Sequence, residues 1–167
     1  GNDTDGKLIA GLREWADVIL VGAGTVQAEG YGPATTPMAV VTRSLELGTS
    51  LGIFHGSRLM VLAPEHSLVD AASLPHARGL IEAGAEVHST GSGTPADIVA
   101  TLRGLGFHRI LCEGGPSLYA AMLAADLIDV LHLTVDPTIS NQDGPFGLEL
   151  PAGDPFVRRF ALEDATM

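Results

Sequence analysis

Residues 18–26 read VILVGAGTV, and this stretch decides the fold that the sequence predicts. Its first four residues form a short aliphatic run, mostly β-branched, which is typical of a strand buried on both faces of a parallel sheet. Gly22 and Gly24 follow at once, and Thr25–Glu29 is expected to open a short helix. A strand that passes through glycine directly into a helix is a building unit of α/β proteins.

A second turn of the same kind follows residues 109–112, which read RILC and predict another buried strand. The next residues read EGGPS, and a helix is expected over 117–127, with Pro116 fitting a first helical position. Glycine lets a phosphate approach the backbone closely, and a helix start offers free N–H donors. One such turn is weak evidence, because tight turns need glycine anyway. Two in one sheet indicate a site for a dinucleotide pyrophosphate.

The end of the next strand, Met38–Val41, favours one type of dinucleotide. The first turn lacks the Rossmann fingerprint, because its third glycine would fall at Gln27, and no acidic residue follows the second strand. Instead the chain reads Thr42-Arg43-Ser44 there. Two hydroxyls and a guanidinium suit a ribose 2′-phosphate, which predicts NADPH over NADH. The alternative is a solvated arginine at a strand end.

The remaining elements alternate between strand and helix, which predicts an α/β fold with a mostly parallel sheet and helices on both faces. Leu8, Leu12 and Trp15 are expected to line one face of the first helix, with Trp15 in the core.

We expect residues 1–167 to form a single domain. The other expected strands are 58–63, 86–89, 129–135 and 158–162, and the other helices are 5–17, 68–83 with a break at Pro75, and one capped by Thr94 and ended by Gly104 and Gly106.

Composition excludes several classes of protein. Acidic residues outnumber basic ones 20 to 9, for a formal net charge of −11, which disfavours a nucleic-acid binder. No apolar run is long enough to span a membrane. Cys112 is the single cysteine, so no internal disulfide forms and a cytoplasmic protein is expected. We interpret Cys112 as a buried apolar residue rather than a nucleophile, and the histidines show no metal-binding spacing, so no metal is predicted.

Three linked motifs resemble those of the riboflavin-pathway pyrimidine reductases. Residues 18–26 are similar to the family's D-x-x-L-V-G-A-G-T-V segment. Residues 110–118, ILCEGGPSL, resemble its L-x-E-G-G-x-x-L segment, and residues 127–133, LIDVLHL, its L-(V/I)-D-E-L-x-L stretch. Their order and spacing also agree, and the resemblance covers roughly residues 5 to 140.

The resemblance implies a dihydrofolate-reductase-like fold, NADPH as cofactor, and reduction of the ribosyl group of 5-amino-6-(5-phosphoribosylamino)uracil to ribityl. It also implies a homodimer that pairs near the last strands, to which an apolar strand over 130–135 is suited. Thr42, Arg43 and Ser44 match the family's adenosine 2′-phosphate side. The other expected cofactor contacts are Gly22, Ala23, Gly24, Thr25, Val26, Glu113, Gly114, Gly115, Ser117 and Leu118.

Two departures from the family leave the substrate and the proton donor open. The family starts with a strand bearing S-x-D-G, and this sequence is expected to begin after it. The family's A-D-x-P-x-L-x-x-R loop, which helps hold a substrate phosphate, is replaced by residues 28–33, AEGYGP, with no nearby arginine before Arg43. Glu113 either orients the site or only accepts amides of its own turn. The alternatives are therefore a dihydrofolate-type reductase on the same fold and a catalytically silent nucleotide-binding domain.

Overall fold

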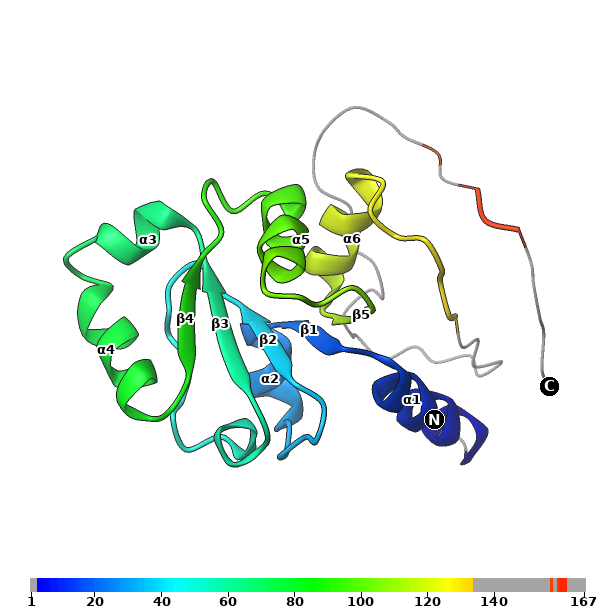
Figure 1. The fold of residues 1–167 in the computed structure, drawn as a ribbon, viewed down its shortest axis with the longest axis horizontal. Helices are drawn as coiled ribbons and strands as arrows, with labels where there is room; N and C mark the ends of the chain where they lie inside the picture. The colour runs from blue at the N-terminus through cyan, green and yellow to red at the C-terminus, as the bar shows by residue number, and fades with distance from the viewer. Residues whose placement is uncertain (1–2, 134–156, 158, 162–167) are drawn as a thin grey trace, which may run out of the picture.

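A computed structural model describes residues 3–133, 157 and 159–161. Its centre is a five-stranded sheet in the order β4-β3-β2-β1-β5, in which every pairing is parallel (Figure 1). The sheet confirms the predicted parallel α/β fold. The strands are β1 (Val18–Gly22), β2 (Met38–Val41), β3 (Leu59–Ala63), β4 (Glu86–Ser89) and β5 (Ile110–Gly114).

Helices connect the strands, and their starts agree with the local signals. Thr94 caps its helix as predicted, because its Oγ1 accepts a hydrogen bond from the backbone N–H of Asp97 at 3.2 Å. The sequence predicts that Pro75 breaks a helix, but Pro75 instead lies in the first turn of a new one. Its missing N–H costs nothing there, because that group has no partner within the helix. The helices are α1 (Asp3–Trp15), α2 (Ala23–Glu29), α3 (Glu65–Val69), α4 (Leu74–Glu82), α5 (Pro95–Gly104) and α6 (Pro116–Ala124), with a 3₁₀ turn, η1, at Gly52–His55.

Both faces of the sheet are covered, because successive side chains of β1 point to opposite sides. Leu20 packs on one face with Leu102 of α5 and Met122 of α6. Val21 packs on the other face in the cluster that contains Leu80 of α4 and buried residues of α2. The continuous aliphatic run in β1 therefore reflects burial on both sides, as predicted.

The direction in which the chain adds strands to the sheet reverses at β1, so β1 and β5 lie at a topological switch point. From β1 the chain passes through α2 to β2 on one side, whereas β5 lies on the other side of β1. In open parallel sheets, ligands bind at the carboxyl ends of the strands at such a reversal. Here α2 and α6 start from adjacent strand ends and pack on opposite faces, so the two glycine turns border this position.

The far side of β5 differs from the prediction. Residues 129–133 form no strand, and Arg159–Ala161 form none either; the other positions of these two expected strands lie outside the described residues. The physical reason is that a strand needs a neighbour for its backbone groups, and β5 pairs only with β1 in the described part of the chain. Val130 and Leu133 consequently stay exposed, and the homodimer expected through this segment remains a prediction.

The helix α1 also packs differently from what its periodicity suggested. Leu8 and Trp15 are 42% and 53% exposed, so the expected buried face of α1, with Trp15 in the core, is wrong. These two side chains instead line a cavity of about 810 Å³ that runs along β5. An amphipathic pattern identifies a helix, but burial depends on a surface for it to pack against.

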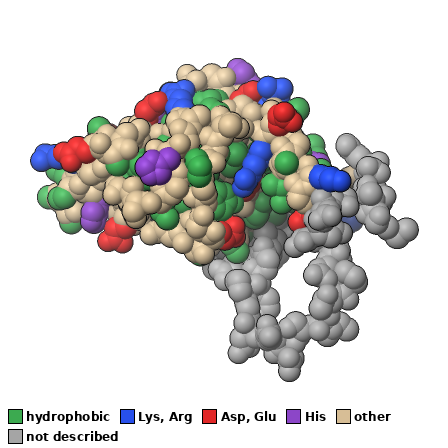
Figure 2. All heavy atoms as spheres, turned by 90° about the horizontal axis from the view of Figure 1, so that it is seen from below, with side chains coloured by type: hydrophobic (Ala, Val, Ile, Leu, Met, Phe, Trp, Pro, Cys, Tyr) green, Lys and Arg blue, Asp and Glu red, His purple; other side chains and the backbone are tan. Residues whose placement is uncertain are grey.

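The surface agrees with the composition. On the face shown in Figure 2, acidic, basic and histidine side chains are interspersed over the described residues, and no continuous basic area is visible. No helix in the described ranges is long and apolar enough to cross a membrane.

Candidate functional site

The two glycine turns predicted separately from the sequence meet at the carboxyl ends of β1 and β5. A Cβ atom on Gly22 would lie 3.6 Å from the backbone nitrogen of Gly115. A Cβ atom on Gly115 would collide with Oγ1 of Thr25, so only glycine fits against α2 there. A Cβ atom at Gly22 would make an ordinary van der Waals contact, so the close contact between the turns depends on the absence of a side chain at Gly115.

The turns also leave backbone groups accessible. Gly115 is the N-cap of α6 and no side chain caps this helix, so its first amides keep their donors for another partner. Gly24 is exposed, and a Cβ atom there would meet nothing within 4 Å, which leaves room for a ligand. Ser117 is exposed in the first turn of α6.

Three predicted contact residues direct their side chains into the core. Ala23 and Val26 are 8% and 0% exposed and belong to the cluster under α2. Leu118 packs against the cluster on the opposite face of the sheet. A contact of Ala23 or Val26 with a ligand would therefore run through the backbone, because their side chains stabilise the turn by packing.

The three predicted contact residues in the turn after β2 have side chains with different roles. Thr42 is buried, and its Oγ1 accepts a hydrogen bond from the backbone N–H of Leu45 at 3.1 Å. Oγ of Ser44 accepts one from the backbone N–H of Glu46 at 3.3 Å. Both hydroxyls thus stabilise the turn, while Arg43 is exposed. Among the three, Arg43 is the side chain best placed to meet an anionic ligand.

Glu113, the residue before the second glycine turn, has partners that the sequence did not indicate. Arg13 of α1 donates from Nε to its Oε1 and from Nη2 to its Oε2, each at 2.6 Å. Tyr31 donates its hydroxyl to Oε2 at 3.0 Å, and the guanidinium lies over the Tyr31 ring, 5.5 Å from the centroid. The side chain of Glu113 therefore joins α1 and the loop after α2 to the second glycine turn.

Charge and burial raise the pKa values of Arg13 and Tyr31, so both side chains stay protonated and can donate hydrogen bonds to Glu113. The hydrogen bond from Arg13 to Glu113, with the charge of that carboxylate, raises the pKa of Arg13. Burial, followed by the neighbouring charge of Glu113, raises the pKa of Tyr31. No local pattern could reveal the cluster, because Arg13 and Glu113 are separated by 100 residues in sequence.

This cluster is part of the lining of the cavity along β5, to which Tyr119 also contributes. Aliphatic residues of α1, β5 and α6 line it too, as do further charged residues such as Glu29 and Arg103. The hydroxyl of Tyr119 donates to the backbone oxygen of Cys112 at 2.9 Å. A ligand in this cavity would lie beside the second glycine turn.

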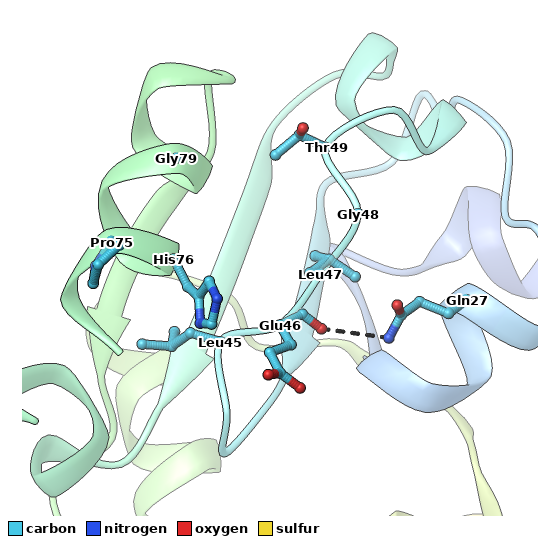
Figure 3. A pocket seen from close by; sticks show the side chains of 9 residues that line it. All are labelled: Gln27, Leu45, Glu46, Leu47, Gly48, Thr49, Pro75, His76 and Gly79. Carbon is cyan, nitrogen blue, oxygen red and sulfur yellow. Dashed lines mark hydrogen bonds between the residues drawn. The ribbon is translucent and has the colours of Figure 1, made fainter. Parts of the chain in front are cut away.

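A second, smaller hollow of about 370 Å³ lies between α2 and α4, away from the cavity along β5 (Figure 3). The loop that follows Ser44 borders it, and the side-chain amide of Gln27 donates to the backbone oxygen of Glu46 at 3.4 Å across it. No lysine or arginine lines this hollow. Among the described residues, no three His, Cys, Asp or Glu side chains are grouped to hold a metal ion.

Cys112 is expected to react slowly with alkylating agents. Burial raises the pKa of its thiol from 9.0 to about 11, so at pH 8 its thiolate is about a hundredfold scarcer than that of an ordinary cysteine. We therefore expect iodoacetamide to label the folded protein about a hundredfold more slowly than the protein in denaturant, as followed by intact mass. Equal rates in the two states would contradict the interpretation of Cys112 as a packing residue.

Comparison with known proteins gives one family and several related structures. The family described as RibD C-terminal domain matches residues 2–148. No curated protein matches the sequence. A pyrimidine reductase-like protein from Corynebacterium diphtheriae is 28% identical, with a TM-score of 0.72 over 84% of this chain and 66% of that chain.

Two further structures share the fold at lower identity. The diaminohydroxyphosphoribosylaminopyrimidine deaminase/5-amino-6-(5-phosphoribosylamino)uracil reductase of Thermotoga maritima is 19% identical, with a TM-score of 0.58 over 74% of this chain and 35% of that one. RibD of Acinetobacter baumannii is 15% identical, with a TM-score of 0.60 over 87% and 44%. The chain thus spans less than two thirds of the length of each. These likenesses confirm the dihydrofolate-reductase-like fold.

Proposed function

This chain belongs to the RibD C-terminal domain family, and from that premise we propose that it is an NADPH-dependent reductase of a pyrimidine-type substrate. The substrate that we favour is 5-amino-6-(5-phosphoribosylamino)uracil, or a close relative. The observation that carries the proposal is the meeting of two glycine turns at the β1–β5 reversal, where Gly115 packs closely against Thr25 and the start of α6 has no side-chain cap. The residues present therefore fit a dinucleotide.

The chain's own residues would bind and orient the cofactor. NADPH, when bound, supplies the hydride, so the protein needs chiefly to position the reactants. The uncapped amides of Gly115 and Ser117 at the start of α6 are suited to the pyrophosphate. The open space at Gly24 admits the cofactor backbone, and the exposed guanidinium of Arg43 is suited to the 2′-phosphate.

The reaction is tested by substrate-dependent oxidation of NADPH. The pyrimidine and dihydrofolate are offered side by side, and the loss of reduced nicotinamide absorbance is followed. Turnover of the pyrimidine supports the proposal, and turnover of dihydrofolate alone replaces it with a dihydrofolate-type reductase. Tight NADPH binding without turnover of either would indicate a catalytically silent nucleotide-binding domain.

Replacing Arg43 by alanine is expected to reduce the preference for NADPH. Arg43→Ala removes the guanidinium that would pair with the 2′-phosphate, so the affinity for NADPH should fall about tenfold or more while that for NADH stays unchanged. Fluorescence titration with both nucleotides measures this. The matched control is Arg78→Ala, an exposed arginine on α4, which should change neither affinity. Equal losses for NADPH and NADH would contradict the assignment of Arg43.

A further inference from the structure

An arrangement of three side chains recurs within the described residues. An arginine donates from Nε and Nη2 to a carboxylate, and its guanidinium lies 5.4 to 5.5 Å from the centroid of an aromatic ring. The three groups are Arg13–Glu113–Tyr31, Arg58–Glu86–Phe107 and Arg109–Asp17–Trp15. Because the three groups share the same contacts, differences in their position and burial can show which of them serves the candidate site.

The groups differ in where they lie on the sheet. Glu86 starts β4, and Asp17 and Arg109 directly precede β1 and β5, so two of the groups join neighbouring strands at their amino ends. Glu113 instead lies near the carboxyl end of β5, directly before Gly114. Ligands bind at carboxyl ends, so of these three groups the Arg13 group is the one beside the glycine turns.

The carboxylate of the Arg13 group is also the most deeply buried of the three. The side chain of Glu113 is 12% exposed, against 44% for Glu86 and 26% for Asp17. A largely buried carboxylate is costly unless it is paired and hydrogen-bonded. Arg13 comes from α1, which is not part of the sheet, so the pair fixes a helix against the site.

The hydrogen bonds to Glu113 leave it one acceptor position. An ionised carboxylate offers about four such positions on its two oxygens. Oε2 accepts from both Arg13 and Tyr31, whereas Oε1 accepts only from Arg13. The remaining position, on Oε1, suits an N–H or O–H donor and repels an anion. Glu113 also lines the large cavity, where a ligand could reach it.

We propose that Arg13 is a positioning residue for the reaction: with Tyr31, it fixes the Glu113 carboxylate so that Oε1 accepts a hydrogen bond from an amine, amide or hydroxyl of the substrate. This inference rests on the proposed reductase function and deepens it. It assigns the part of the cavity beside Glu113 to a hydrogen-bond donor of the substrate rather than to a substrate phosphate. Arg13, paired with Glu113, orients that carboxylate and does not itself bind the substrate.

The test compares the kinetics of Arg13→Gln, Arg13→Lys, Glu113→Gln and the double variant R13Q/E113Q. For Arg13→Gln we expect kcat/KM for the pyrimidine to fall about 10- to 100-fold, because the carboxylate loses its orientation, with the Kd for NADPH unchanged. Arg13→Lys keeps the charge but loses the planar fork, so an intermediate value is expected. The double variant should be no slower than Glu113→Gln, since Arg13 acts only through Glu113.

The matched control is Arg58→Gln, which breaks the equivalent group at the amino ends of β3 and β4, away from the cavity. Thermal melts should show a loss of stability in both arginine variants, but kcat/KM should fall only for Arg13→Gln. Equal kinetic losses in the two variants would show a merely structural role and overturn the inference, as would additive losses in R13Q/E113Q. If Arg13→Gln does not fold, Arg13→Lys and the double variant decide by the same criteria.

The outcome for the wild type separates this inference from the proposed function. A wild type that oxidises NADPH with the pyrimidine, while Arg13→Gln keeps its kcat/KM, would overturn the positioning role and leave the reductase proposal standing. A wild type without turnover of any pyrimidine would overturn the reductase proposal, and the positioning role with it.

Discussion

Gly114→Ala is expected to destabilise the protein by about 2–4 kcal/mol and to abolish NADPH binding. Gly114 has a φ of +96°, a conformation that side chains rarely adopt. An added Cβ atom would also lie 2.6 Å from Cε2 of Tyr119. That ring is held in place because its hydroxyl bonds to the backbone oxygen of Cys112. The β5–α6 turn would therefore have to change shape, and its amides would lose their alignment.

Urea unfolding and NADPH titration measure the two effects of Gly114→Ala. The matched control is Gly79→Ala within α4, where a Cβ atom would meet nothing within 4 Å. We expect this control to be about 0.5–1 kcal/mol more stable than the wild type, because alanine is the better helix former, and to bind NADPH normally. A Gly114→Ala variant with wild-type stability and affinity would show that the shape of this turn is not needed.

Leu20→Ala is expected to have the largest effect on stability outside the glycine turns, about 3 kcal/mol with a range of 2–5. Leu20 is 1% exposed and lies in β1, which pairs with both β2 and β5. Its side chain packs in the cluster formed with α5 and α6, so truncation leaves a cavity that the surrounding sheet cannot close.

Urea unfolding of Leu20→Ala is compared with that of Leu74→Ala. Leu74 starts α4 and is 48% exposed, so its truncation should cost less than about 1 kcal/mol. The ratio of these losses tests whether β1 is central to the sheet. Similar losses for the two variants would contradict the position of β1 between β2 and β5.

Local sequence signals predicted the elements that depend on near neighbours. The strands at Met38–Val41 and Glu86–Ser89 form at the predicted residues, and the Thr94 cap forms as expected. Burial of an aliphatic run and capping of a helix start depend on groups a few residues apart. The same signals were wrong for the strand over residues 129–133 and for the apolar face of α1. Both of these depend on a distant partner.

The sequence by itself determined that the chain is a parallel α/β protein with two strand–glycine–helix turns and an arginine after the second strand. Hydrophobic runs and glycines act locally, so these features can be read from the chain. Only the tertiary structure decided that β5 lies beside β1, so that the two turns touch, and that Arg13 and Tyr31 meet Glu113. Such contacts join residues up to 100 positions apart, and only the packing of the sheet and helices brings their side chains within hydrogen-bond distance.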